Sequence, residues 1–196
     1  MPEPVVARAH GGANAVTSFS CCNSTLSHLV VSAASDRTVH VLDAAVGGTA
    51  RVIRDAHQRP VHAVALPVPS PHVNESGAPG ATEPIYYDVF LTAAADGVVA
   101  LWDLRADRCA ARFSEHVNRR DTSVQASFSP CMRFIATGSE DRAAFLYDIR
   151  RGTALAKLQH HTDVVSCVAW NPLYPQLATA SYDGRIHFFT ESGDVC

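Results

Sequence analysis

Residues Leu91–Arg105 read LTAAADGVVALWDLR, and this stretch decides the fold because variants of it recur along the chain. The other copies are IATGSEDRAAFLYDIR at Ile135–Arg150, LATASYDGRIHFFT at Leu177–Thr190 and, more weakly, VVSAASDRTVHVLD at Val30–Asp43. Each copy places an Asp before a Gly or an Arg, and a closing Asp or Thr follows seven positions later. A fixed period of this kind indicates a repeat architecture.

Apolar and polar residues alternate on both sides of the recurring Asp, as in Val98–Asp103 and Ala143–Asp148. Such alternation predicts half-buried antiparallel strands joined by a tight hairpin. A His and a further apolar run precede each hairpin, and a short run that we interpret as an outer strand follows most of them. The histidines are His10, His57, His116 and His161, and the outer runs are Ala50–Ile53, Ala110–Phe113 and Ala154–Leu158.

These copies resemble the repeats of the WD-repeat family. Trp102-Asp103 is the dipeptide that gives the family its name, and Tyr147-Asp148 and Leu42-Asp43 stand at the same place in other copies. The resemblance covers about residues 5 to 190 and implies an all-β fold, a β-propeller whose blades are four-stranded antiparallel sheets. It predicts one domain over residues 1–196, with four blades and repeats at about 10–53, 57–113, 116–158 and 161–190.

The number of blades is lower than the about seven or eight with which propellers of this family usually close. The chain is therefore expected to be part of a longer propeller, with a four-bladed ring as the alternative. Val5–Arg8 is interpreted as an outer strand of the last or a preceding blade. The segment 67–84 contains five prolines and predicts a loop insertion, while Val117–Asp121 lengthens the approach to the third blade.

A His, a hydroxyl residue, an Asp and a bulky residue recur together, which raises the question of a catalytic triad. An enzyme needs one tuned site, whereas every blade needs a fastener, so the repetition favours a structural role. The resemblance implies a hydrogen-bonded network that ties the loop entering a blade to its hairpin turn. The sets are His57, Thr92, Asp96 and Trp102; His116, Thr137, Asp141 and Tyr147; and His161, Thr179, Asp183 and Phe189.

We expect this network to be complete only in the second blade. Phe189, and Leu42 at the same place in the first copy, cannot donate a hydrogen bond, so the fourth and first blades should be fastened less firmly. A buried carboxylate is tolerated only where its oxygens find donors, and a His ring and turn amides can supply them.

The composition excludes several other classes of protein. With 47% hydrophobic and 18% charged residues the chain can bury a core, and a net charge of −3 without a polybasic run argues against nucleic-acid partners. No apolar run approaches the length of a membrane helix, so no membrane partner is expected. An intracellular, cytoplasmic location follows as an expectation, with the nucleus and the cilium as open alternatives.

No cofactor, metal or catalytic residue is expected. The six cysteines show no CxxC pair and no zinc-finger spacing, and those within strands are interpreted as buried free thiols. His160 and His161 could suggest a metal pair, but neighbouring strand residues point to opposite faces. Phosphate-binding loops, GxSxG elbows and HExxH motifs do not occur in the sequence.

The predicted function is a non-enzymatic scaffold that binds protein partners, with further propeller blades from the same or another chain as an additional possibility. Candidate contact residues on the entry loops and hairpin turns are Gln58, Arg59, Arg119, Arg120, Arg142 and Tyr182. The alternative is a substrate receptor of a cullin-RING ubiquitin ligase, because Trp102–Arg105 and Tyr147–Arg150 match the WD-x-R box of such receptors. In that case Arg105 and Arg150 would contact the ligase.

Overall fold

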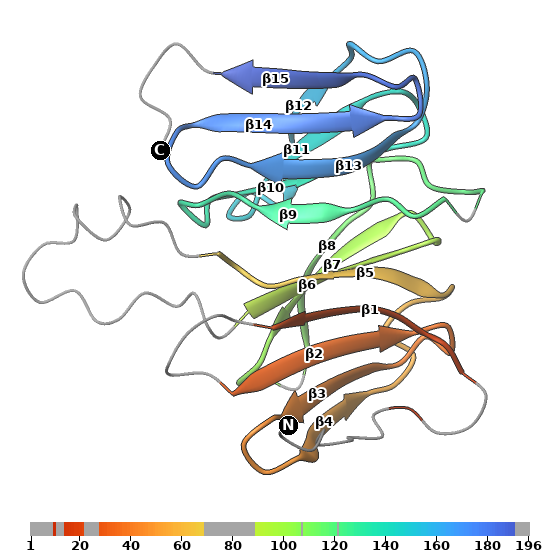
Figure 1. The fold of residues 1–196 in the computed structure, drawn as a ribbon, viewed down its shortest axis with the longest axis vertical. Helices are drawn as coiled ribbons and strands as arrows, with labels where there is room; N and C mark the ends of the chain where they lie inside the picture. The colour runs from red at the N-terminus through yellow and green to blue at the C-terminus, as the bar shows by residue number, and fades with distance from the viewer. Residues whose placement is uncertain are drawn as a thin grey trace, which may run out of the picture.

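The computed structural model describes residue 10 and residues 14–21, 28–68, 89–106, 108–120 and 122–190 of the 196-residue chain. These residues form fifteen strands and no helix, so this part of the chain contains no helix able to cross a membrane. Figure 1 shows the strands as four sheets stacked along the long axis of the molecule. The predicted all-β class is confirmed.

Each sheet is built from consecutive antiparallel strands, and each lies within one predicted repeat; we call the sheets the first to fourth blades. The first three contain four strands and the fourth contains three within the described residues. In order, the blades are β1 (Val16–Cys21), β2 (Leu29–Ala34), β3 (Val39–Asp43) and β4 (Gly48–Ile53); β5 (Val61–Ala65), β6 (Val89–Ala94), β7 (Val98–Asp103) and β8 (Cys109–Phe113); β9 (Ala126–Phe128), β10 (Phe134–Thr137), β11 (Ala144–Asp148) and β12 (Thr153–Leu158); and β13 (Val165–Trp170), β14 (Gln176–Ser181) and β15 (Ile186–Thr190).

A tight turn joins the second and third strands of every blade, and it explains why Gly or Arg follows the recurring Asp. The residue after that Asp has a positive φ, which is 69° at Arg37, 72° at Gly97, 66° at Arg142 and 76° at Gly184. Glycine adopts this left-handed conformation freely, whereas another residue pays about 1 kcal/mol or more. In the first, second and fourth blades the Asp supports the turn by accepting an amide two residues on, as Asp96 Oδ1 does from Val98 at 3.1 Å.

Alternate residues of a blade point to its two faces, and both faces are apolar. We call the face toward the higher-numbered blade the forward face and the opposite one the rear face. In the second blade Leu91 and Leu101 lie on the forward face, while Phe90 and Trp102 lie on the rear face. Strand register places equivalent residues at the same points of the other blades.

Three apolar clusters hold the blades together, and each joins a forward face to the rear face of the next blade. Val31 and Val41 of the first blade pack with Phe90 and Trp102 of the second. The third blade contributes Ala136, Ala144 and Leu146 to a cluster with Val165, Val168 and Leu177 of the fourth. Burial of these side chains is the main favourable term for joining neighbouring sheets.

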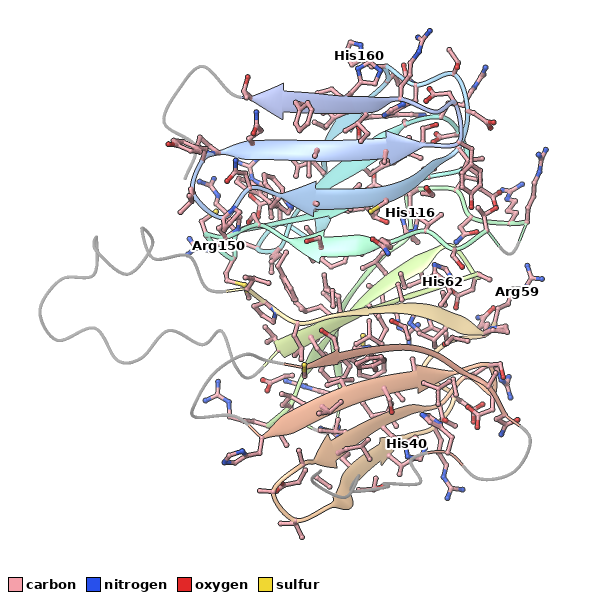
Figure 2. All side chains as sticks on the ribbon, viewed as in Figure 1. His40, Arg59, His62, His116, Arg150 and His160 are labelled. Atoms are coloured by element: carbon pink, nitrogen blue, oxygen red, sulfur yellow. The ribbon has the colours of Figure 1, made fainter. Side chains whose placement is uncertain are left out.

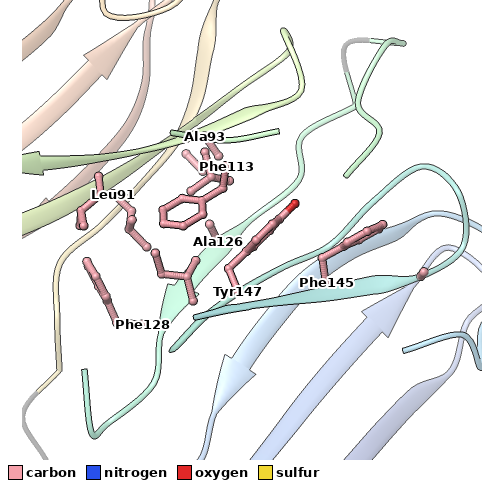
Figure 3. Close-up of a cluster of buried hydrophobic side chains, with 12 residues drawn as sticks. Leu91, Ala93, Phe113, Ala126, Phe128, Phe145 and Tyr147 are labelled. Atoms are coloured by element: carbon pink, nitrogen blue, oxygen red, sulfur yellow. The ribbon is translucent and has the colours of Figure 1, made fainter. Parts of the chain in front are cut away.

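The cluster between the second and third blades contains four buried aromatic side chains, which are Phe113, Phe128, Phe145 and Tyr147 (Figure 3). Phe113, from the outer strand of the second blade, lies with its ring centroid 5.1 Å from that of Tyr147. Tyr147 also stacks on Phe145 at 6.2 Å, and its side chain is fully buried. Tilted and stacked aromatic pairs each add about 0.5–1.5 kcal/mol beyond simple burial.

Inner strands are also linked sideways by hydrogen bonds, which fix the blades relative to one another. These bonds cross all three blade boundaries and run from the Val64 amide to Ser18 Oγ at 3.1 Å, from His62 Nε2 to the Val124 carbonyl at 2.8 Å, and from the Gln125 amide to the Ser166 carbonyl at 2.9 Å. The predicted strand at Val5–Arg8 and nearly all of the predicted loop at 67–84 lie outside the described residues.

The first and fourth blades lie at opposite ends of the molecule (Figure 1). The four blades therefore form an open arc, and the alternative of a four-bladed ring is wrong for this structure. The rear face of the first blade and the forward face of the fourth blade carry exposed apolar side chains, Phe19 and Phe188 among them.

The interpretation of the cysteines as buried thiols is corrected by the structure. Among the described residues Cys21 is exposed, and Cys109, Cys131 and Cys167 are half-buried free thiols. Cys21 lies on the innermost strand of an end blade, where no further blade covers it within the described part of the chain.

Gly138 provides a test of how closely the third and fourth blades approach. A Cβ added at Gly138 would lie 2.0 Å from the Val165 carbonyl oxygen, which is a backbone atom and cannot rotate away. We expect Gly138→Ala to lower the free energy of unfolding by about 1–3 kcal/mol, measured by urea denaturation. Gly48→Ala is the control, because nothing lies within 4 Å of its added Cβ; equal effects of the two substitutions would contradict this packing.

Candidate functional site

The second blade contains the full hydrogen-bonded set. His57 Nδ1 lies 3.1 Å from Asp96 Oδ2, His57 Nε2 lies 2.7 Å from Thr92 Oγ1, and the Trp102 indole N–H donates to the same Thr92 oxygen at 2.8 Å. His57 and Thr92 are buried, so each bond is protected from water. A consistent direction is Trp102 to Thr92, Thr92 to His57 and His57 to Asp96.

Asp96 joins two segments that are distant in the sequence. Its carboxylate accepts the amide of Gln58 at 2.9 Å from the entry loop and the amide of Val98 at 3.1 Å from the hairpin turn. Burial raises the pKa of Asp96, but the bonds from His57 and the two amides outweigh burial and hold the pKa below its usual range. The charged carboxylate thus ties the loop to the turn.

The fourth blade keeps the His, hydroxyl and Asp bonds without the aromatic donor. His161 lies 3.0 Å from Asp183 Oδ2 and 2.8 Å from Thr179 Oγ1. The amide of Thr162 also donates to Asp183 Oδ2 at 2.9 Å and, with the other bonds, lowers the pKa of that carboxyl group. Phe189 packs at 5.5 Å from the His160 ring and has no group that could bond Thr179.

The third blade departs from the expected set. His116 contacts the Tyr147 hydroxyl, which accepts the His116 amide at 3.0 Å and lies 3.2 Å from the His116 ring nitrogen Nδ1. Thr137 Oγ1 donates instead to the Gln125 carbonyl at 3.2 Å, and no hydrogen bond in the described part of the chain joins His116 to Asp141. The Tyr147 hydroxyl, which stands where the second blade has the Trp102 indole nitrogen, bonds His116 directly. The expected chain of bonds from the aromatic residue through Thr to His and Asp is therefore not formed.

Glu140 takes over the role that Asp96 plays in the second blade. Its carboxylate accepts the amides of Arg119 at 2.9 Å and Arg120 at 2.8 Å, as well as the Thr122 hydroxyl at 2.9 Å. Burial opposes the charge, yet these bonds lower the pKa of Glu140. Asp141 forms an ion pair with Lys157 instead. The longer entry loop predicted at Val117–Asp121 brings its amides to Glu140 rather than to Asp141.

In the first blade a Thr stands between the His and the Asp. His10 lies 3.1 Å from Ser32 Oγ and 3.1 Å from Thr38 Oγ1. Thr38 in turn donates its hydroxyl to Asp36 at 2.6 Å, and Asn14 donates to the other Asp36 oxygen at 2.8 Å. The Leu42 side chain has no polar atom that could join this network.

His160 and His161 have different surroundings, as expected for neighbouring residues. His161 is buried in the fourth-blade network, whereas His160 is exposed beside Phe189. Among the described residues no three His, Cys, Asp or Glu side chains are grouped as metal ligands. The polar residues that recur in the blades are shared out among separate networks and do not converge on one reactive atom.

The candidate contact residues fall on two opposite ends of the strands. We call the end that carries the hairpin turns and entry loops the turn face, and the other end the opposite face. Figure 2 shows Arg59 on the turn face and Arg150 on the opposite face. Six of the candidates are exposed on the turn face, namely Gln58, Arg59, Arg119, Arg120, Arg142 and Tyr182. Arg105 and Arg150 are exposed on the opposite face.

The networks make the turn face a firmly held surface. The loop at Arg119 and Arg120 is fixed by Glu140, and Arg59 Nη1 donates to the Arg119 carbonyl at 3.3 Å. Beside it, Asp141, Arg142, Gln159, His160 and His161 line a polar pocket of 480 Å³ between the third and fourth blades. Sequence reasoning missed Glu140 and Thr38; the only signal for Glu140 was its place next to the turn Asp behind a lengthened loop.

Asp96→Ala tests the fastening role of the complete set. Removing the carboxylate leaves His57 and two amides without a partner, and we expect a loss of about 2–4 kcal/mol in the free energy of unfolding. Asp141→Ala is the matched control in the third blade, where the carboxylate bonds neither His116 nor the loop, and we expect a change within about 1 kcal/mol. Urea denaturation of both variants measures the difference, and equal losses would argue against a special role for Asp96.

His116 makes stability depend on pH. Burial, aided by repulsion from His62, lowers its pKa from 6.5 to about 4 in the folded protein. Between pH 6.5 and pH 4 the His116 side chain therefore binds a proton in the unfolded chain but not in the folded chain. Above pH 6.5 His116 is neutral in both states and this loss of stability is absent. As the pH falls from 6.5 through 4, the free energy of unfolding decreases by about 3 kcal/mol.

We expect His116→Gln to weaken this acid dependence. The free energy of unfolding at pH 7 and at pH 4.5 should differ less in the variant than in the unmodified protein, and the His116 ring should titrate near pH 4 by nuclear magnetic resonance. An unchanged difference between the two pH values would show that other groups cause the acid sensitivity.

Comparison with known proteins agrees with this geometry. Residues 107–148 and 152–190 match the family described as WD domain, G-beta repeat. WD repeat-containing protein 26 homolog of Drosophila melanogaster is 37% identical over 91 residues, which cover 45% of this chain and 14% of that protein. Polyadenylation factor subunit 2 of Schizosaccharomyces pombe is 34% identical over 89 residues, which cover 44% of this chain and 17% of that protein.

These relatives are much longer than the matched region, because the chain spans only 14% and 17% of their lengths. A chain in the crystal structure of the mitotic checkpoint complex superposes with a TM-score of 0.73 at 16% identity, over 92% of this chain and 49% of that chain. At this identity the superposition shows the fold. The chain is therefore folded as four consecutive blades of a β-propeller, and residues 107–148 and 152–190 within it match WD40 repeats.

Proposed function

We propose that the chain is a non-enzymatic scaffold that binds a protein partner through its turn face. The observation that carries this proposal is the fixed group of exposed arginines between the second and third blades. Glu140 holds the backbone of Arg119 and Arg120, and the carbonyl of Arg119 accepts a bond from Arg59. A surface whose backbone is already ordered loses little conformational entropy when a partner binds.

The chemistry of this surface favours an acidic segment of a partner. Arg119 and Arg120 are exposed, and the carboxylate below them bonds their amides at 2.9 and 2.8 Å, so the loop is fixed through its backbone. Arginine forms paired, charge-assisted hydrogen bonds with carboxylates and is common at the centre of interfaces. Arg142 and Tyr182 extend the same face toward the fourth blade.

The test is a comparison of two double variants of the whole chain. Arg119→Ala with Arg120→Ala changes the turn face, and Arg105→Ala with Arg150→Ala changes the opposite face by the same number of charges. Affinity purification with quantitative mass spectrometry should show partners that the first variant loses about tenfold or more and the second retains. Partners retained equally by both variants would refute binding through the arginines of the turn face.

The alternative function is a substrate receptor of a cullin-RING ubiquitin ligase. It is supported by the shared geometry of the two WD-x-R boxes at Trp102–Arg105 and Tyr147–Arg150. Asp103 Oδ1 accepts the Arg105 amide at 2.8 Å, and Asp148 Oδ1 accepts the Arg150 amide at 2.8 Å. Both arginines are exposed at the same end of consecutive blades. The two boxes could therefore contact one ligase adaptor together.

This alternative predicts the reverse outcome of the same comparison. The ligase adaptor should co-purify with the unmodified chain, and the variant with Arg105→Ala and Arg150→Ala should recover about tenfold less of it. The variant with Arg119→Ala and Arg120→Ala should recover an unchanged amount. Absence of the adaptor from the unmodified preparation would exclude the receptor role.

A closer relationship is also proposed on sequence grounds. The chain resembles the C-terminal repeats of WD repeat-containing protein 27, through stretches such as DRTVHVLD, FSPCMRFIATGSEDR and HTDVVSCVAWNPLYPQLATASYDG. This resemblance implies a repeat scaffold and no catalysed reaction, which agrees with the proposed binding role.

A further inference from the structure

The turn between β11 and β12 carries two arginines, and the turn between β3 and β4 has the same backbone bonds without them. In the third blade Asp148 Oδ1 accepts the amides of Arg150 at 2.8 Å and Arg151 at 3.1 Å. In the first blade Asp43 Oδ1 accepts the amides of the two residues at the same places, at 2.9 and 3.3 Å. One carboxylate at the end of the third strand thus builds both turns.

The two turns also end in the same way. Gly152 and Gly47 each donate an amide at 2.9 Å to the carbonyl of the Asp that builds the turn, and their φ angles are 71° and 69°. The first-blade turn forms with Ala45 and Val46 in the middle, so this turn does not require arginine side chains. The two guanidinium groups of the third-blade turn therefore have no part in forming it.

A third arginine is joined to this turn from the loop between β9 and β10. The carbonyl of Arg133 accepts the Ile149 amide at 3.0 Å. The Arg133 guanidinium carbon lies 5.1 Å from the centroid of the Phe134 ring, and Arg133 Nε lies 3.8 Å from Asp148 Oδ2. We call the three residues on this side of the blade the arginine cluster, namely Arg133, Arg150 and Arg151.

The arginine cluster carries more positive charge than its surroundings neutralise. Among the described residues, the carboxylate within ion-pair distance of the cluster is that of Asp148, which is buried. Burial raises the pKa of Asp148, but the amide bonds from Arg151 and Arg150 and the charges of Arg133 and Arg151 outweigh burial and hold the pKa below its usual range. Three positive charges therefore lie beside one negative charge, which leaves two in excess.

The guanidinium donors of the cluster are not used by the rest of the described chain. None of the three side chains donates a hydrogen bond to a described residue, whereas Arg51 and Arg112 donate to backbone carbonyls. The three residues are exposed on the opposite face, where Figure 2 shows Arg150. A guanidinium presents its N–H groups as a planar fork that fits phosphate and carboxylate oxygens. The cluster is thus built for an anion.

We propose that the arginine cluster binds a phosphate monoester carried on a side chain of a protein partner. Such a group has a charge of about −1.5 to −2 at pH 7 and three acceptor oxygens, so it matches the two excess charges and the guanidinium forks. A carboxylate has about half of this charge and fewer oxygens. Asp148 already fixes the backbone of the turn, so binding orders side chains alone.

A site for a single phosphate agrees with the charge of the whole chain. The net charge is −3, which gives no long-range attraction to a nucleic acid or an anionic bilayer. The positive charge also does not continue evenly along the opposite face, because Ala45 and Val46 occupy the equivalent turn of the first blade. Local recognition of one phosphorylated side chain therefore fits better than binding to an extended polyanion.

Titration of the whole chain with N-acetyl-O-phosphoserine amide, followed by nuclear magnetic resonance, tests the site. The amides of Arg150, Arg151 and Gly152 should shift in a saturable way, with a dissociation constant of about 1 mM. N-acetyl-aspartate amide should bind about fivefold or more weakly, because it has less charge. Arg133→Ala with Arg151→Ala should weaken binding of the phosphoserine probe about tenfold or more.

Arg54→Ala with Arg185→Ala is the matched control. It removes the same charge from exposed residues of the turn face and should leave the affinity for the probe unchanged. Both double variants retain Arg105 and Arg150, so the result does not depend on the ligase alternative or on the arginines of the scaffold proposal. Arg133→Lys with Arg151→Lys keeps the charge but removes the paired donors, and we expect a loss of about threefold or more.

Several results would overturn the proposal. Absence of saturable shifts in the turn at about 20 mM phosphoserine probe would refute the site, and so would equal losses in the two alanine double variants. Equal affinity for the aspartate probe would refute selection of a phosphate. Sedimentation of the chain with phosphatidylcholine vesicles that contain a phosphoinositide, lost on Arg133→Ala with Arg151→Ala, would assign the cluster to a lipid headgroup instead of a protein partner.

Discussion

A four-stranded sheet in this chain has two apolar faces, and its stability depends on covering both. In this chain the forward face of one blade packs on the rear face of the next blade at three successive contacts, which covers both faces of the inner sheets. Close approach is part of the solution, since Gly138 leaves space for the backbone of the next blade. Every other feature, including the position of the turn face, depends on this stacking.

Stacking holds the blades together, and the hydrogen-bonded networks have a separate role. They fasten entry loops to hairpin turns, and the chain reaches this result by different routes. Asp96 does it with His57 in the second blade, while Glu140 does it in the third blade and His116 bonds Tyr147 instead. The common requirement is a charged carboxylate that receives loop amides, because a hydrogen bond to an ionised acceptor is stronger than one between neutral groups.

The sequence was sufficient to predict the blades. The constant spacing from the recurring Asp to the closing residue indicates the hairpin, and the alternation of apolar and polar residues indicates strands with two different faces. It could not predict the exchange between Asp141 and Glu140, which depends on where a longer loop brings its amides. It also could not show that Ile186 and Phe188 are exposed. Both have the pattern of core residues, and only the three-dimensional arrangement reveals that no neighbour covers them in the described structure.

The same arrangement places the candidate binding surface away from the two ends of the arc. Arg119 and Arg120 lie between the second and third blades, which are the two blades with both faces covered. Their loop is held by Glu140 and by the stacking of these inner blades, so its shape does not depend on what covers the ends of the arc.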